Sequence, residues 1–199
     1  DSPIVCVIDS GIQENHKYLS PAVLQDESVC FIKGETSTND EYGRDGRTGG
    51  HGTRVAGAIL YPEGVPVHGD YILPCYIRNV RVLDSQNDLP METNPCQIIS
   101  DVVQRFAIDA ARKSKVFNHS IGERVPFDGE EFKHMSTWAE KIDDVSYEND
   151  VLFIQASGNI SQSVIRGLIS IGYNYPVYFY EKPARLSNPA QSLQALTVG

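Results

Sequence analysis

Three polar side chains in this sequence are of types that transfer protons or stabilise charge: an aspartate, a histidine and an asparagine. Asp9 directly follows the apolar run at 4–8, and His51 comes 42 positions later, at the start of a run rich in small residues. Asn159 follows the turn-forming pair Ser157-Gly158. A buried Asp can fix the tautomer and orientation of a nearby His, which can then act as a general base. The pattern therefore predicts proton-relay chemistry.

Apolar periodicity predicts the elements that would position these residues. Strands are expected at 4–8, 28–32, 75–83, 115–121, 151–156 and 195–198, and helices at 51–60, 96–113 and 130–149. In the last helix, the face expected to pack on the core holds Phe132, Met135, Trp138, Ala139 and Ile142. Alternating strands and helices, with β-branched strands, predict an α/β fold with a mainly parallel central sheet and helices on both faces. The stretches 34–50 and 61–74 are expected to be surface loops.

The parallel sheet would bring the three polar residues together. Ligands and catalytic groups in open α/β sheets gather beyond the carboxyl ends of the strands. Asp9 lies at such an end, His51 begins the next predicted helix, and Asn159 comes just after the strand at 151–156. We therefore expect all three at one edge of the sheet.

Each residue also has an ordinary structural interpretation. Asp-Ser-Gly after a strand is often only a turn or a helix cap, and a histidine at a helix start often caps or packs. Gly158-Asn159 suits an ordinary turn with positive φ. The joint order of Asp, His and Asn at spacings that fit a sheet favours the catalytic interpretation.

Composition limits the other possibilities. A chain of 199 residues fits one domain, and a net charge of −9 argues against a nucleic-acid partner. The apolar runs are far shorter than the roughly 20 residues of a membrane span. The four scattered cysteines favour reduced thiols and a cytoplasmic setting, with secretion left open. No cofactor is expected: the acidic stretch 38–45 could bind a cation such as calcium, but it carries no recognisable ligand set, and a solvated loop is favoured.

Three segments resemble the aspartate, histidine and oxyanion-hole motifs of the subtilases, the subtilisin-like serine peptidases. They are Val-Ile-Asp-Ser-Gly at 7–11, Gly-His-Gly-Thr-Arg-Val-Ala-Gly at 50–57 and Ala-Ser-Gly-Asn at 156–159. The order of the residues separates the chain from α/β-hydrolases, where Ser precedes the acid, and from chymotrypsin-like enzymes, where His precedes Asp. The resemblance covers nearly the whole chain and implies a three-layer subtilisin-like fold, truncated at its C-terminus.

The resemblance also implies roles for individual residues and a peptide or protein substrate. Asp9 would accept a hydrogen bond from His51, and Asn159 would donate one to the oxyanion of the tetrahedral intermediate. The strand that pairs with a peptide substrate would be Ser120, Ile121 and Gly122. The opposite wall of the main specificity pocket would be Ala156, Ser157 and Gly158.

One part of the family pattern is not found. The nucleophilic serine of subtilases lies in a Gly-Thr-Ser motif several tens of residues beyond the asparagine, and the 40 residues after Asn159 do not contain that motif. We therefore expect residues 1–199 to be a single, incomplete catalytic domain, inactive as given. A missing C-terminal segment or an oligomer contact would then cover its exposed core. The alternative is a catalytically dead pseudoprotease that binds peptides or regulates a partner.

Overall fold

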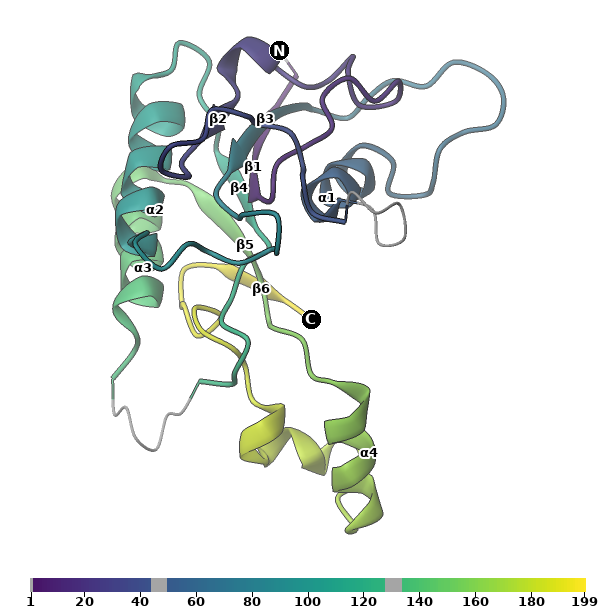
Figure 1. Ribbon diagram of the computed structural model, residues 1–199, viewed down its shortest axis with the longest axis vertical. Coiled ribbons are helices and arrows are strands. Elements are labelled where there is room, and N and C mark those ends of the chain that lie inside the picture. Colours follow the sequence, from purple (N-terminus) through teal and green to yellow (C-terminus); the bar gives the residue numbers. More distant parts are fainter. Residues whose placement is uncertain (1, 44–49, 128–133) are drawn as a thin grey trace.

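A six-stranded parallel sheet forms the centre of the protein, and helices cover both of its faces (Figure 1). The computed structural model describes residues 2–43, 50–127 and 134–199. The strand order is β2-β3-β1-β4-β5-β6, and every pairing is parallel. The strands are β1 (Ile4–Asp9), β2 (Val29–Cys30), β3 (Tyr76–Arg81), β4 (Val116–His119), β5 (Leu152–Ala156) and β6 (Leu196–Val198). The predicted α/β fold is confirmed.

Two apolar clusters, one on each face of the sheet, hold the helices in place. Along β1, Cys6 and Ile8 join the cluster under α2 (Pro95–Val103) and α3 (Thr137–Asn149). Val7 joins the other cluster, under α1 (His51–Leu60). Successive side chains of a strand point to opposite faces, so a strand that is apolar throughout must be covered on both sides. This explains why 4–8 is a continuous apolar run.

The helix expected at 96–113 ends earlier. The α-helical part, α2, stops at Val103, and a π-helical turn, η2 (Gln104–Asp109), follows it. The prediction was wrong beyond residue 109, where a buried guanidinium binds the backbone carbonyl oxygen of Arg112. Arg78 of β3 is 1% exposed and donates to the carbonyl oxygens of Phe106 (3.4 Å) and Arg112 (2.6 Å).

The helix expected at 130–149 begins later, at Thr137. Its start is set by Ser136, whose hydroxyl accepts the N–H of Ala139 (3.1 Å) and so caps the helix. Met135 precedes this cap, and Phe132 lies outside the described residues. The strand expected at 28–32 is only Val29–Cys30, at the edge of the sheet beside β3.

An arm built from residues 162–184 extends from the body of the protein (Figure 1). It consists of α4 (Gln162–Ser170) and two short 3-10 helices, η3 (Val177–Tyr180) and η4 (Lys182–Ala184). No helix was predicted here, although Val164, Ile165 and Leu168 have helical spacing. A third short helix, η1 (Gln25–Glu27), precedes β2. Within the described part of the chain, no helix has both the length and the apolarity to cross a membrane.

A buried polar contact joins β4 to β5. The Nδ1 atom of His119 lies 2.6 Å from Oε1 of Gln155. The amide nitrogen of Gln155 donates to the carbonyl oxygens of Ile121 (2.8 Å) and Ala156 (3.0 Å), which fixes the orientation of the amide group. Because Oε1 must then accept, His119 carries its proton on Nδ1.

Protonation of His119 should destabilise the fold in acid. Burial lowers its pKa to about 4 from the ordinary 6.5, although the hydrogen bond to Gln155 acts in the opposite direction. The unfolded chain therefore binds a proton between these two values while the folded chain does not. We expect this group to remove about 3 kcal/mol of unfolding free energy as the pH falls from 6.5 to 4.

The measurement is urea unfolding across this pH range for the unmodified chain and for His119→Leu. The variant should lose less stability on acidification, because it has no imidazole to protonate. Equal pH dependence in the two proteins would contradict the assignment.

Candidate active site

A short polar contact at the carboxyl edge of the sheet joins Asp9 to His51. Asp9 is the last residue of β1 and is fully buried, and His51 is the first residue of α1. The Nδ1 atom of His51 lies 2.7 Å from Oδ1 of Asp9, which also accepts the N–H of Ser10 (2.7 Å). With Nδ1–H donating to the carboxylate, Nε2 is the nitrogen free to accept a proton.

Glycines allow the start of α1 to lie this close to β1. A Cβ atom on Gly52 would fall 2.2 Å from the carbonyl oxygen of Gly11 and 3.1 Å from Cβ of Asp9. Gly11 itself has φ +98°, which strongly favours glycine in the turn after β1. The small residues on both sides of the Asp–His pair therefore set its spacing.

Asp9 makes the imidazole of His51 more basic. Its hydrogen bond raises the pKa of His51 above the ordinary 6.5, partial burial lowers it, and the charge of Asp9 raises it further. Of the more distant charges, Arg54 lowers the pKa and Asp40 raises it. The side chain of His51 remains 32% exposed, so it can reach a substrate.

A groove of about 760 Å³ runs past His51 and collects most of the predicted site residues. Ser120, Ile121 and Gly122 follow β4 and line it, and so do Ala156, Gly158 and Asn159, which end or follow β5. The two segments lie together because they follow β4 and β5, which are neighbouring parallel strands. Asn159 is exposed, which leaves its amide available to a ligand.

Ser157 lies differently from its neighbours. Its N–H donates to the carbonyl oxygen of Val198 (2.8 Å), and its own carbonyl accepts the N–H of Ser187 (3.0 Å). It is not among the described residues that line the groove. The backbone of Ser157 instead ties the groove wall to β6 and to the segment that follows the arm.

Several groove residues were not singled out from the sequence. They are Tyr42, Arg54, Leu83, Gln86, Asn87, Asp88, Leu89, Pro95, Glu123, Arg124 and Trp138. Trp138 was expected only as a core residue, and it is indeed 7% exposed. Trp138 lies near the start of α3, packs in the core and also lines the groove. Hydrophobic spacing predicts only the contact with the core.

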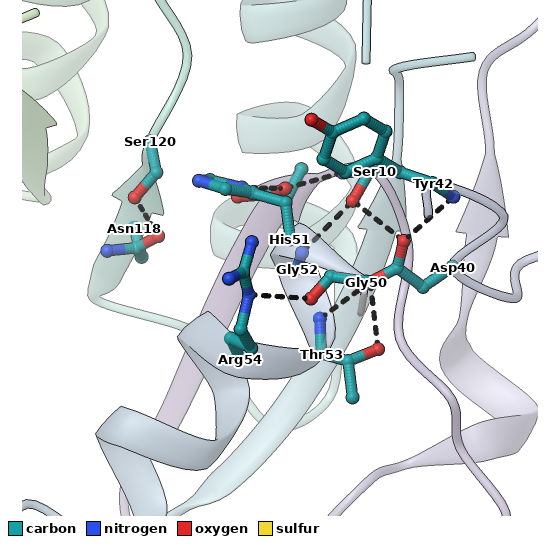
Figure 2. Close-up of polar contacts among 11 residues, drawn as sticks. Ser10, Asp40, Tyr42, Gly50, His51, Gly52, Thr53, Arg54, Asn118 and Ser120 are labelled. Atoms are coloured by element: carbon teal, nitrogen blue, oxygen red, sulfur yellow. Dashed lines mark hydrogen bonds and ion pairs between the residues drawn. The ribbon is translucent and has the colours of Figure 1, made fainter. Parts of the chain in front are cut away.

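The expectation of a solvated loop at 38–45 was wrong for Asp40, which is 1% exposed. Figure 2 shows its carboxylate among donors from three segments. It accepts hydrogen bonds from the Ser10 hydroxyl and from the backbone N–H groups of Tyr42 and Thr53. These hydrogen bonds compensate for the water that the carboxylate loses on burial. Across the described residues, no group of three or more His, Cys, Asp or Glu could hold a metal ion.

Comparisons with known proteins identify the family of this chain. The sequence matches the subtilase family over residues 1–199. No match is found among the curated proteins.

Among solved structures, the chain is similar to a lanthipeptide protease, with 20% identity and a TM-score of 0.60 over 99% of this chain and 48% of the other. It is similar to the epidermin leader peptide processing serine protease of Staphylococcus aureus, with 18% identity and a TM-score of 0.57 over 99% of this chain and 46% of the other. A cold-adapted subtilisin-like serine proteinase gives 25% identity and a TM-score of 0.50 over 79% of this chain and 46% of the other. The chain thus spans about half the length of these structures.

Replacing Asp9 should make His51 less basic. We expect Asp9→Asn to lower the pKa of His51, because it removes the charge and weakens the hydrogen bond that raise it. Arg54→Gln should raise the pKa, because Arg54 acts in the opposite direction. The titration of the His51 ring by NMR measures both effects, and an unchanged pKa in Asp9→Asn would contradict the assigned contact.

Proposed function

Because this chain belongs to the subtilase family, we propose that it is part of a serine endopeptidase and supplies the acid, the base and an oxyanion donor of its active site. The observation that carries the proposal is the 2.7 Å contact between His51 and the buried Asp9, beside a groove that Asn159 also lines. An ordinary capping histidine needs no buried carboxylate behind it. This pair has the arrangement that a general base requires.

In the proposed reaction, Nε2 of His51 takes the proton of a serine hydroxyl as the serine oxygen bonds to the scissile carbonyl carbon. The carbonyl electron pair moves to its oxygen, and Asp9 stabilises the imidazolium that forms. When the C–N bond breaks, His51 gives its proton to the leaving amine. A water molecule then releases the acyl group by the same steps.

Asn159 is proposed to donate its amide N–H to the oxyanion. Loss of such a donor lowers the rate about 10²–10³-fold. The nucleophilic serine is proposed to come from a part of the protease beyond these residues, since the chain spans about half of the structures it resembles.

The substrate is proposed to be a peptide that lies along the groove in an extended conformation. Ser120, Ile121 and Gly122 continue from β4 and line the groove, so their backbone can pair with a peptide by strand addition. The buried amide of Gln155 donates to the carbonyl oxygens of Ile121 and Ala156, which both line the groove. This contact would keep the two walls at a fixed separation.

Casein hydrolysis tests the proposal. The longer protein that contains these residues should hydrolyse casein, and His51→Ala should reduce kcat about 10⁴-fold or more. His134→Ala is the control, because His134 is exposed and is not among the described groove residues. The 199-residue chain alone should show no turnover.

Casein turnover by the purified 199-residue chain, lost in His51→Ala, would show that the nucleophile lies within it and would contradict this assignment. Peptide binding without turnover in the longer protein would instead favour the pseudoprotease alternative.

A further segment of the protease is proposed to cover the β6 edge of the sheet. Leu193, Leu196 and Val198 are 80%, 54% and 52% exposed. Leu196 and Val198 belong to β6 and Leu193 precedes it, and exposed apolar side chains at an edge strand are a common site of further packing.

Hydrogen exchange measures this coverage. The backbone N–H groups of β6 should exchange at least about tenfold more slowly in the longer protein than in the 199-residue chain, because an added segment would protect them. The N–H groups of β1, which lies inside the sheet, serve as the internal reference. Equal exchange at β6 in strictly monomeric samples of both proteins would argue against the proposed covering.

A further inference from the structure

The carboxylate of Asp40 is buried beside the Asp9–His51 pair but touches neither side chain in the contacts that the structure describes. One oxygen accepts the Ser10 hydroxyl (3.0 Å) and the Tyr42 N–H (3.3 Å). The other accepts the N–H (2.9 Å) and the hydroxyl (2.8 Å) of Thr53. These donors match the acceptor capacity of an ionised carboxylate, which a carboxamide would only half supply.

The residues that Asp40 contacts lie next to Asp9 and His51 in the chain, and Figure 2 shows Asp40 between Ser10 and Thr53. Ser10 follows Asp9 in the chain, and its N–H donates to the same Asp9 oxygen that binds His51. The Ser10 hydroxyl also accepts the N–H of Gly52, the residue after His51 (3.0 Å). Asp40 therefore binds the turn that carries the acid and the first helical turn that carries the base.

Gly50, directly before His51, leaves room for the Asp40 carboxylate because it has no Cβ atom. A Cβ atom on Gly50 would lie 1.9 Å from Oδ2 of Asp40. The N–H of Thr53, at the third position of α1, donates to Asp40. In most helices the side chain of the N-cap residue accepts this N–H, but Gly50 at the N-cap has no side chain. Asp40 thus caps α1 from a distant loop.

We propose that Asp40 is a positioning residue: through the Ser10 hydroxyl and the first turn of α1, it holds the imidazole of His51 in hydrogen-bonding contact with Asp9. The proposal rests on the proposed function only where it treats His51 as a base. The positioning itself is a property of the folded chain and does not require a nucleophile.

A simple charge effect must be separated from positioning. The charged groups that act on His51 are Asp9, Arg54 and Asp40, so loss of the Asp40 charge alone would lower the pKa of His51. Ser10→Ala removes the hydroxyl link without changing any charge. Comparison of Ser10→Ala with Asp40→Asn therefore isolates the mechanical contribution.

The experiment follows the Nδ1–H proton of His51 by NMR in the 199-residue chain. We expect its exchange with solvent to become at least about fivefold faster in both Asp40→Asn and Ser10→Ala, the factor that corresponds to the loss of one ordinary hydrogen bond. Asp143→Asn is the matched control. Its carboxylate also accepts several hydrogen bonds, from Ser192, Leu193 and Gln194, but it lies on α3.

Faster exchange in Ser10→Ala, with no change in Asp143→Asn, supports the proposal. Unchanged exchange in Ser10→Ala overturns it, even if Asp40→Asn lowers the pKa of His51, because only the charge effect would remain. If Asp40→Asn does not fold, Ser10→Ala decides the question alone. Casein hydrolysis by the longer protein tests the catalytic role separately, so failure of one proposal can be told from failure of the other.

Discussion

The site depends on hydrogen-bond donors that reach the Asp9 carboxylate, because this carboxylate is fully buried. Burial of a carboxylate without such donors is very unfavourable. Here Oδ1 has two donors, the N–H of Ser10 and the imidazole of His51, while Oδ2 has no hydrogen-bond partner in the described part of the protein. Much of the stabilisation therefore comes from His51 itself. The same contact fixes which imidazole nitrogen carries the proton and raises the pKa of the ring.

Other buried polar groups serve the same edge of the sheet. Asp40 binds the segments that carry Asp9 and His51, and Gln155 binds the backbone on both sides of the groove. Both side chains are buried and both have several hydrogen-bond partners, as most buried polar groups do. A single hydrogen bond of this kind contributes about 1 kcal/mol, but its geometry is specific. Their main effect is thus to fix distances between segments that are far apart in the sequence.

Local patterns could be predicted where they depend on burial alone. The apolar run at 4–8 required cover on both faces, and a helix was expected at 51–60, where α1 is found. Prediction failed where a distant side chain competes with the local pattern. The carbonyl oxygen of Arg112 is bound by Arg78, so the helix expected to reach 113 does not, and the hydroxyl of Ser136 delays the start of α3. The arm at 162–184 was missed although its first helix has an ordinary apolar spacing.

The sequence by itself determined the α/β class, the order of Asp, His and Asn, and their positions near strand ends, because these follow from periodicity and from the topology of parallel sheets. Tertiary structure decided what those residues contact. Asp40 was expected in a solvated loop, and nothing near it in the sequence names Ser10 or Thr53 as its partners, which lie 30 and 13 positions away. Hydrogen bonds act over about 3 Å in space whatever the separation along the chain. Only the folded backbone can therefore reveal which donors a buried carboxylate finds.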